Sequence, residues 1–138
     1  MENTIIIDAT DAILGRLASF AAKQALLGKK VIIVNSEKAK IIGDPKVILE
    51  RYLKKRSLGR GTQKGPIISR KPEQILRRAI RGMIGRKKAT GREAFKRVKC
   101  YEGTPEQFAD KEKIHIETKP AIKFLTLGQL SKLLGYKK

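Results

Sequence analysis

The sequence predicts an α/β fold: a three-layer α/β/α domain with a small, mostly parallel sheet, basic loops and a C-terminal helix. Three features near the N-terminus predict this class. Residues 4–7 and 30–35 are β-branched runs typical of short buried strands, and residues 13–27 between them carry apolar side chains at helical spacing. Two strands joined by one helix through short links pair in parallel, with a right-handed crossover.

The first helix has clear boundary signals. Asp11 is predicted to cap its N-terminus and Gly28 to end it. Asp8, in the turn before it, is expected to stabilise that turn. The residues at helical spacing are Leu14, Leu17, Ala18, Ala21 and Ala25.

The chain then predicts a second helix followed by a loop. Residues 39–42 are a brief apolar run, after which Asp44 and Pro45 predict an N-cap and a first-turn proline. The helix should extend to about residue 55, and its glycines predict that the basic stretch 56–71 is a flexible loop. The residues expected to face the core are Val47, Ile48, Tyr52 and Leu53.

A third helix begins at Pro72 and is predicted to have two faces. At about 100° per residue, its arginines and its apolar residues separate onto opposite sides. We therefore expect it to pack on the body and present three guanidinium groups outward. The arginines are Arg77, Arg78 and Arg81, and the apolar residues are Leu76, Ala79, Ile80 and Met83.

Shorter elements are predicted after this helix. Residues 86–88 form a basic loop, residues 92–97 a short turn of helix, and residues 98–101 a strand. Residues 113–117 alternate apolar and polar side chains, which is typical of an edge strand or of an extended tail segment.

The C-terminal helix carries the sequence pattern of a capping box, formed by Thr126 and Gln129. Its apolar stripe comprises Leu127, Leu130, Leu133 and Leu134. No segment resembles a linker between two cores, so residues 1–138 are predicted to form one domain.

Charge is concentrated in the middle of the chain. Residues 51–100 hold eighteen Lys or Arg and two acids, Glu73 and Glu93, which is +16 of the total net charge of +19. Because like charges repel, gathering them in one segment costs folding free energy unless a polyanion neutralises them. The sequence therefore predicts that residues 51–100 face nucleic acid.

Other function classes find less support. No apolar run approaches the ~20 residues of a membrane-spanning helix, and the first residues do not resemble a signal peptide, so no membrane partner is expected. A single cysteine, Cys100, is consistent with a reducing cytosol. The simplest interpretation of Cys100 is a small buried side chain with a structural role. The glycines at 59, 61 and 65 miss the spacing of nucleotide-binding loops.

No catalytic or metal-binding set is evident. His115 is the only histidine, which excludes a His–His metal pair. Asp8 and Asp11 could imitate a carboxylate pair, but turn formation and capping explain both. We therefore expect no enzyme activity, no cofactor, no metal and no small-molecule substrate.

The composition of the basic segment indicates which nucleic acid is bound. Aromatic residues are few, which disfavours a stacking platform for single strands and favours a folded RNA recognised by shape and phosphate position. Two alternatives stay open: a protein that compacts DNA, and an α/β enzyme that acts on RNA.

Several blocks in order resemble one family. They are residues 13–19, 31–35, 76–84, 87–88, 91–92 and 99–103. Together they are similar to the universal large-subunit ribosomal protein number thirteen, from residue 4 to about 105. The direct step from Gly28 into the second strand resembles the archaeal and eukaryotic branch.

The resemblance implies a structural, non-catalytic role in the large ribosomal subunit of the cytoplasm and binding of its rRNA during assembly. Its implied partners are that rRNA and neighbouring ribosomal proteins, not a second copy of the chain. One departure is Gly85, where the family usually has proline. The residues predicted to bind RNA are Arg16, Arg56, Arg60, Lys64, Arg70, Lys71, Arg77, Arg78, Arg81, Arg86, Lys87, Lys88, Arg92, Lys96, Arg97 and Lys99.

Overall fold

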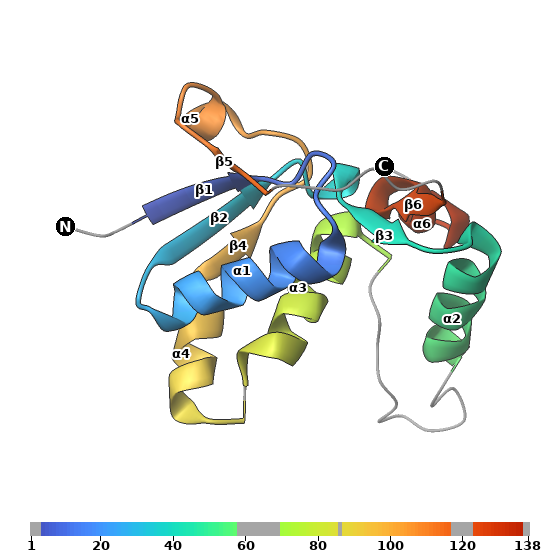
Figure 1. Cartoon of the computed structure of the whole chain (residues 1–138), viewed down its shortest axis with the longest axis horizontal. Coiled ribbons are helices and arrows are strands. Elements are labelled where there is room, and N and C mark those ends of the chain that lie inside the picture. Colours follow the sequence, from blue (N-terminus) through green and yellow to red (C-terminus); the bar gives the residue numbers. More distant parts are fainter. Residues whose placement is uncertain (1–3, 58–69, 86, 117–122, 137–138) are drawn as a thin grey trace.

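The structure is a computed structural model that describes residues 4–57, 70–85, 87–116 and 123–136, excluding the side chains of residues 55–57 (Figure 1). Its larger sheet has the strand order β4-β2-β1-β5 and every pairing in it is parallel. These strands are β1 (Thr4–Asp8), β2 (Lys30–Val34), β4 (Val98–Cys100) and β5 (Ile114–His115). The predicted parallel pairing of the first two strands and the edge position of residues 114–115 are confirmed.

Three helices cover one face of this sheet (Figure 1). They are α1 (Leu14–Leu26), α3 (Pro72–Ile84) and α4 (Ala89–Lys96). The core lies between this helical layer and the sheet, where side chains such as Ile7, Leu17 and Ile33 are fully buried. The α1 stripe is buried from Leu17 to Ala25, as its spacing predicts, while Leu14 is half-buried.

The opposite face of the sheet has a thin third layer. Ile6, Ile32 and Val34 are buried there, and Tyr101 and Phe108 pack against them. Phe108 belongs to α5 (Glu106–Ala109), a four-residue helix that the sequence did not predict. The α/β class and the mostly parallel sheet are confirmed, and the layers differ strongly in size (Figure 1).

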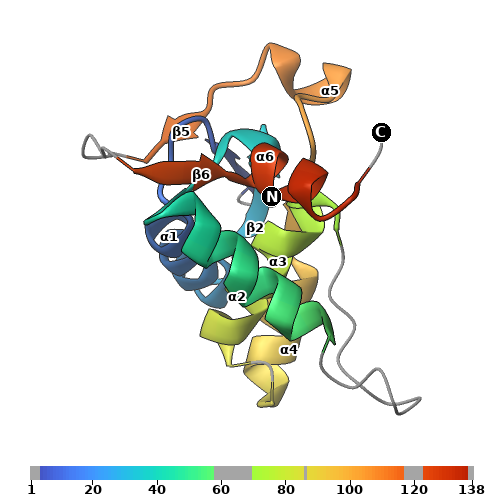
Figure 2. The same cartoon turned by 90° about the vertical axis from the view of Figure 1, so that its right-hand side faces the viewer.

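A second, two-stranded sheet joins distant parts of the chain. Here β3 (Lys40–Ile42) pairs antiparallel with β6 (Phe124–Thr126), a strand that the sequence did not predict. The helices α2 (Pro45–Ser57) and α6 (Leu127–Leu133) lie beside it at one end of the molecule (Figure 2). A short 3-10 helix, η1 (Ser36–Lys38), links β2 to β3.

The helix caps are partly as predicted. Thr126 and Gln129 form the complete capping box of α6, and Asp44 accepts a hydrogen bond from the N–H of Lys46 at 3.0 Å in the first turn of α2. Asp11, in contrast, does not cap α1, whose N-cap is Ile13. Its backbone is left-handed (φ 60°) and its carboxylate pairs with Lys40 at 3.2 Å instead.

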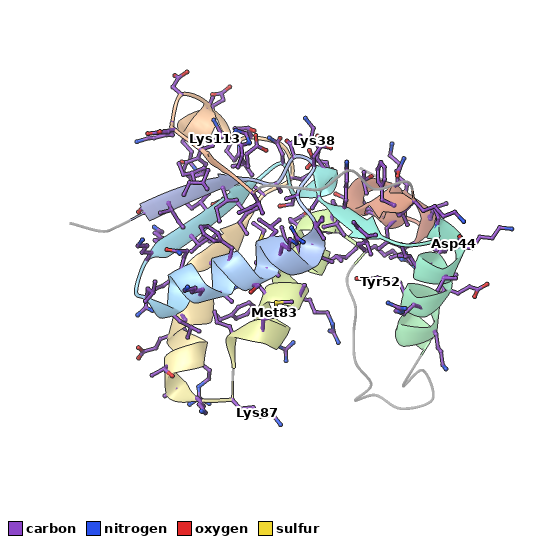
Figure 3. The ribbon with its side chains drawn as sticks, in the orientation of Figure 1. Lys38, Asp44, Tyr52, Met83, Lys87 and Lys113 are labelled. Carbon is purple, nitrogen blue, oxygen red and sulfur yellow. The ribbon has the colours of Figure 1, made fainter. Side chains whose placement is uncertain are left out.

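Four residues predicted to face the core are exposed by about half. Met83 (Figure 3) lies in the last turn of α3, where Ile84 is buried in its place. On α2, Ile48 is buried and Tyr52 half-buried, because this helix packs mainly against β6 and has only one covered side. The four exposed residues are Met83, Leu133, Val47 and Leu53.

Candidate nucleic-acid interface

The α3 and α4 helices meet in a tight hairpin. Gly85 ends α3 in a left-handed conformation (φ 72°), which glycine adopts without strain. Gly91 is buried inside α4, and a Cβ built on it would stand 2.1 Å from the Gly85 carbonyl oxygen. Only glycine permits this close approach of the two backbones. Gly91 is therefore part of α4, although glycine usually interrupts helices, and α4 begins at Ala89. The predicted start at residue 92 was therefore three residues late.

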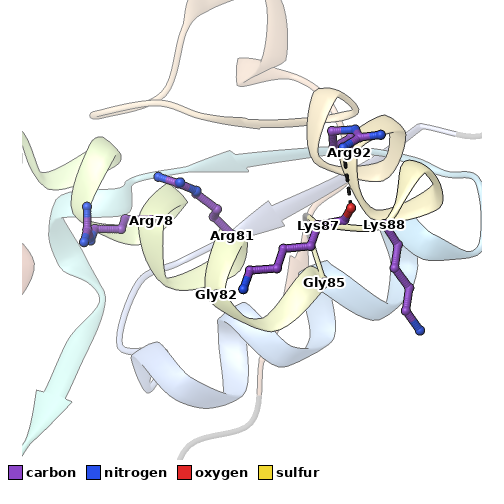
Figure 4. Close-up of a pocket in the computed structure, with 7 residues that line it drawn as sticks. All are labelled: Arg78, Arg81, Gly82, Gly85, Lys87, Lys88 and Arg92. Carbon is purple, nitrogen blue, oxygen red and sulfur yellow. Dashed lines mark hydrogen bonds between the residues drawn. The ribbon is translucent and has the colours of Figure 1, made fainter. Parts of the chain in front are cut away.

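A concave surface of about 670 Å³ opens at this hairpin, and we call it the α3–α4 hollow (Figure 4). Among the residues that the structure describes, five cationic side chains and two glycines line it, and no acidic residue does. The lining residues are Arg78, Arg81, Gly82, Gly85, Lys87, Lys88 and Arg92. The five cations belong to the predicted RNA-binding set, so the fold gathers residues from three segments of the chain at one place.

Each segment contributes differently to the α3–α4 hollow (Figure 4). Arg78 and Arg81 lie three residues apart on α3, a spacing that places them on one side of the helix. The α3–α4 connection supplies the two lysines. Arg92 of α4 donates from Nη1 to the carbonyl of Lys87 at 3.4 Å.

The positive charges of the hollow are not neutralised within the part of the chain that the structure describes. The ion pairs of Lys40 with Asp11 and of His115 with Asp8 both lie away from the hollow. All five cationic residues are exposed. The hollow therefore offers several adjacent donors of positive charge, which is the arrangement that binds phosphate groups in an oligoanion.

Arg77 does not share the outward face of its two neighbours, which corrects the prediction of three outward guanidinium groups. Its guanidinium lies over the ring of Phe95, 4.0 Å from the ring centroid. Its Nε donates to the Val98 carbonyl at 3.4 Å. Residue 77 lies at the flank of the helix, between the core stripe and the solvent side, so its long side chain reaches the hydrophobic body.

Arg97 also lies outside the α3–α4 hollow. It is half-buried, and its Nη1 donates to the carbonyl of Ala25 at 3.0 Å. The last carbonyls of a helix have no partner within the helix. Arg97 therefore satisfies the C-terminal end of α1 and ties it to the start of β4.

A second concave surface, of about 340 Å³, lies where α3, the end of α4 and β4 meet, and we call it the β4-edge hollow. It shares no lining residue with the α3–α4 hollow. Lys96 and Lys99, both predicted to bind RNA, line it and are exposed. The described residues that line it are Gln74, Arg77, Lys96, Val98, Lys99, Cys100 and Tyr101. Gln74 was not among the predicted residues, because a single glutamine carries no distinctive signal in the sequence.

The remaining predicted RNA-binding residues lie elsewhere. Arg16 is exposed on α1, and Arg70 and Lys71 are exposed just before α3. The Ser131 hydroxyl of α6 donates to the Arg70 carbonyl, which ties the entrance of α3 to the last helix. Outside the described residues fall Arg60, Lys64, Arg86 and the side chain of Arg56, together with most of the predicted loop 56–71.

The thiol of Cys100 is not activated. Burial raises its pKa to about 12, more than the neighbouring Arg77 lowers it, and the Glu73 carboxylate raises it further. The thiol is therefore neutral at physiological pH, and a thiolate nucleophile is not formed there. Cys100 is half-buried and packs against the core beside the β4-edge hollow, so it is less buried than the sequence predicts.

The carboxyl ends of the parallel strands are where open α/β sheets commonly bind ligands. Here the polar groups at this edge bond to one another. Asp8 Oδ1 accepts from the Thr10 hydroxyl at 2.7 Å and from the Asn35 amide at 3.1 Å. The Glu37 carboxylate accepts from the N–H of Gly103 at 2.9 Å. These side chains close the edge rather than presenting a reactive group.

Among the residues that the structure describes, no group of three or more His, Cys, Asp or Glu side chains is placed to hold a metal ion. No helix among them has the length and apolar character needed to cross a membrane.

The fold and the two hollows define a class: a basic α/β protein that gathers unpaired cations on concave surfaces around one helical hairpin. Comparison with known proteins identifies the family within this class. The family model described as ribosomal protein L13 matches residues 2–107. The chain belongs to the ribosomal protein L13 family, as the sequence blocks indicated.

Individual relatives extend the similarity beyond residue 107. A protein of Methanocaldococcus jannaschii is 45% identical over 96% of this chain and 98% of its own length. A protein of Archaeoglobus fulgidus is 39% identical over 96% and 88%, and one of Haloarcula marismortui is 41% identical over 97% and 92%. Each of the three is named large ribosomal subunit protein uL13. All three are archaeal, in agreement with the branch that the sequence resembles.

Proposed function

We propose that this chain is a structural constituent of the large ribosomal subunit that binds and stabilises folded large-subunit rRNA, during subunit assembly. The names of its relatives and its membership of the L13 family support the assignment to the subunit. The physical support for RNA binding comes from the charge distribution, since residues 51–100 carry most of the net charge of +19.

The single observation that carries the proposal is the α3–α4 hollow. In the described part of the chain, five exposed cations and no acid line it, and the Gly85–Gly91 contact fixes the two helices that present these cations. A rigid concave set of cations matches phosphates that converge from more than one backbone segment, as they do in a folded RNA. Duplex DNA presents its phosphates on regular convex strands instead, which fits this surface less well.

The proposed contact surface is wider than this hollow. Lys96 and Lys99 would extend it along the β4 edge, and Arg16, Arg70 and Lys71 would contact neighbouring phosphates. Arg60, Lys64, Arg86 and the Arg56 side chain are retained in the proposal from their place in the basic segment. Arg77 and Arg97 would act mainly by holding the surface in shape, because both have partners within the fold.

The proposal includes the setting of the protein. The chain would act as one domain, as a single copy in each cytoplasmic large subunit, in contact with rRNA and neighbouring ribosomal proteins. Its contribution is to neutralise phosphates and hold RNA segments together. No turnover, cofactor or small-molecule substrate enters this role, and the hydrogen-bonded edge of the sheet supports a non-catalytic function.

The test is binding of the purified protein to a large-subunit rRNA transcript over a range of salt concentrations. Arg78→Ala combined with Arg81→Ala should weaken binding. The slope of log affinity against log salt should become shallower by about one for each phosphate contact that is lost. The matched control is Lys111→Ala with Lys132→Ala, which removes two exposed cations from outside both hollows.

Equal losses from the two double variants would contradict the placement of the interface. Competition at fixed salt separates the proposal from a DNA-compacting function, which predicts equal competition by duplex DNA. Calorimetric titration with ATP and Mg²⁺ in the absence of RNA addresses the enzyme alternative, and binding of either in a defined site would contradict a purely structural role.

A further inference from the structure

The two hollows differ in their chemistry. The described residues that line the α3–α4 hollow are all cations or glycines, which suit phosphates rather than the edge of a base. The β4-edge hollow adds to its two exposed lysines the exposed, neutral amide of Gln74. An amide both donates and accepts hydrogen bonds, as the edges of nucleobases do.

Arg77 supplies a fixed planar group to the β4-edge hollow. The Phe95 ring at 4.0 Å and the Val98 carbonyl at 3.4 Å hold its guanidinium in place. A guanidinium has five N–H donors, and the terminal amino groups of Arg77 make no hydrogen bond to another described residue. Its orientation is therefore set by the protein, while donors remain for a ligand.

We propose that the β4-edge hollow receives one unstacked nucleotide of the bound RNA. Its base contacts Gln74 and the Arg77 guanidinium, and its phosphates lie on Lys96 and Lys99. This inference rests on the proposed function, because it requires that the chain binds rRNA. RNA-binding proteins commonly recognise bases splayed out of loops and bulges by hydrogen bonds and by stacking on arginine. The hollow, at about 340 Å³, lies within the roughly 300–1,000 Å³ range of small-ligand sites.

Salt dependence separates a base contact from a phosphate contact. Gln74→Ala should weaken binding to the large-subunit rRNA transcript by about three- to tenfold, the value of one net hydrogen bond, without changing the salt slope. Lys96→Ala combined with Lys99→Ala should weaken binding and make the slope of log affinity against log salt shallower by about two. Gln107→Ala, on the exposed side of α5, is the matched control and should leave both quantities unchanged.

Chemical probing of base edges identifies the nucleotide directly. One unpaired nucleotide should be protected from dimethyl sulfate or a carbodiimide in the wild-type complex and should become reactive with Gln74→Ala. Gln74→Glu provides a second variant, because an acid in the first turn of α3 favours the helix while changing the amide. Thermal unfolding without RNA checks that both variants are folded.

The outcomes distinguish this inference from the proposed function. Wild-type affinity and an unchanged protection pattern in both Gln74 variants would overturn the nucleotide site while leaving RNA binding intact. A change of salt slope with Gln74→Ala would also overturn it, because a neutral side chain contacts no phosphate through charge. Failure of the wild-type protein to prefer rRNA over duplex DNA would overturn the proposed function itself.

Discussion

Gly91 of α4 lies directly against the carbonyl of Gly85, so closely that a Cβ on residue 91 would stand 2.1 Å from that oxygen and 2.8 Å from the carbonyl oxygen of Ile84. The contact joins the end of one basic helix to the start of the next. It sets the relative positions of Arg78 and Arg81 on α3 and of Arg92 on α4.

Gly91→Ala should therefore destabilise the protein in the absence of RNA. The backbone atoms it would meet cannot move aside without separating the two helices, and overpacking of this kind costs about 1–3 kcal/mol. Equilibrium urea unfolding measures the change. The matched control is Gly82→Ala on α3, where a Cβ meets nothing within 4 Å and alanine should stabilise the helix by up to about 1 kcal/mol. Equal effects of the two substitutions would contradict the close approach.

Replacing Arg97 by alanine should mainly reduce stability, whereas replacing Arg81 by alanine should mainly weaken RNA binding. Arg97→Ala removes the donor to the Ala25 carbonyl and should lower the free energy of unfolding by about 1–2 kcal/mol. Arg81 has no such bond among the described residues, so Arg81→Ala should leave stability within about 0.5 kcal/mol and weaken RNA binding instead. Urea unfolding and salt-dependent RNA binding on both variants check the pair. A stability loss at Arg81 larger than that at Arg97 would reverse the assignment.

Cys100 should be unreactive toward thiol reagents while the protein is folded. Its pKa is raised to about 12 by burial, so the nucleophilic thiolate is scarce at pH 8. Because it is the only cysteine, the rate of iodoacetamide modification reports on it alone. We expect slow modification in buffer and rapid modification in denaturant. A folded-state rate equal to that of a free thiol would contradict the pKa shift.

The same shift has a consequence at high pH. The unfolded thiol, with its ordinary pKa of 9.0, loses its proton before the folded thiol does. The folded state then binds more protons, and stability falls as pH rises from about 9 toward 12. Cys100→Ala should show a smaller decline than the wild type over this range when unfolding is followed by urea titration at each pH.

Asp8 should stabilise the fold above its ordinary pKa of 3.8. Burial opposes its ionisation, but hydrogen bonds from the Thr10 side chain and backbone and from the Asn35 amide outweigh burial and lower the pKa. The stabilisation is therefore present at neutral pH and is lost as pH falls through the lowered pKa. Asp8→Asn should be less stable than the wild type at pH 6, and the gap should narrow below pH ~3.8. A constant difference across that range would contradict the prediction.

Most of the first half of the fold could be predicted from the sequence because its signals are local. The strands around residues 5 and 32 and the helix between them are periodic over their own length, and they appear within two residues of the expected boundaries. The strand β6 could not be predicted in this way. Its three residues form a strand only because β3 lies beside them in the folded chain.

In the candidate nucleic-acid interface, too, some features follow from local sequence signals and others from tertiary contacts. The concentration of cations in residues 51–100 is visible without a structure, and five of the predicted residues meet in one hollow. Which arginines point outward depends on tertiary partners. Arg77 turns toward the Phe95 ring and Arg97 toward the Ala25 carbonyl, and no pattern in the sequence indicates either contact.

The antiparallel ladder between β3 and β6 imposes an order of events during synthesis. Lys40 pairs with Thr126, so a strand made early waits for a segment that is made much later. A nascent chain that stops before Lys123 has no partner for that strand, and α6, which packs on α3, is absent as well. Synthesis of residues 123–133 is therefore the step that completes this part of the fold, and termination before it leaves a basic fragment with an open strand edge.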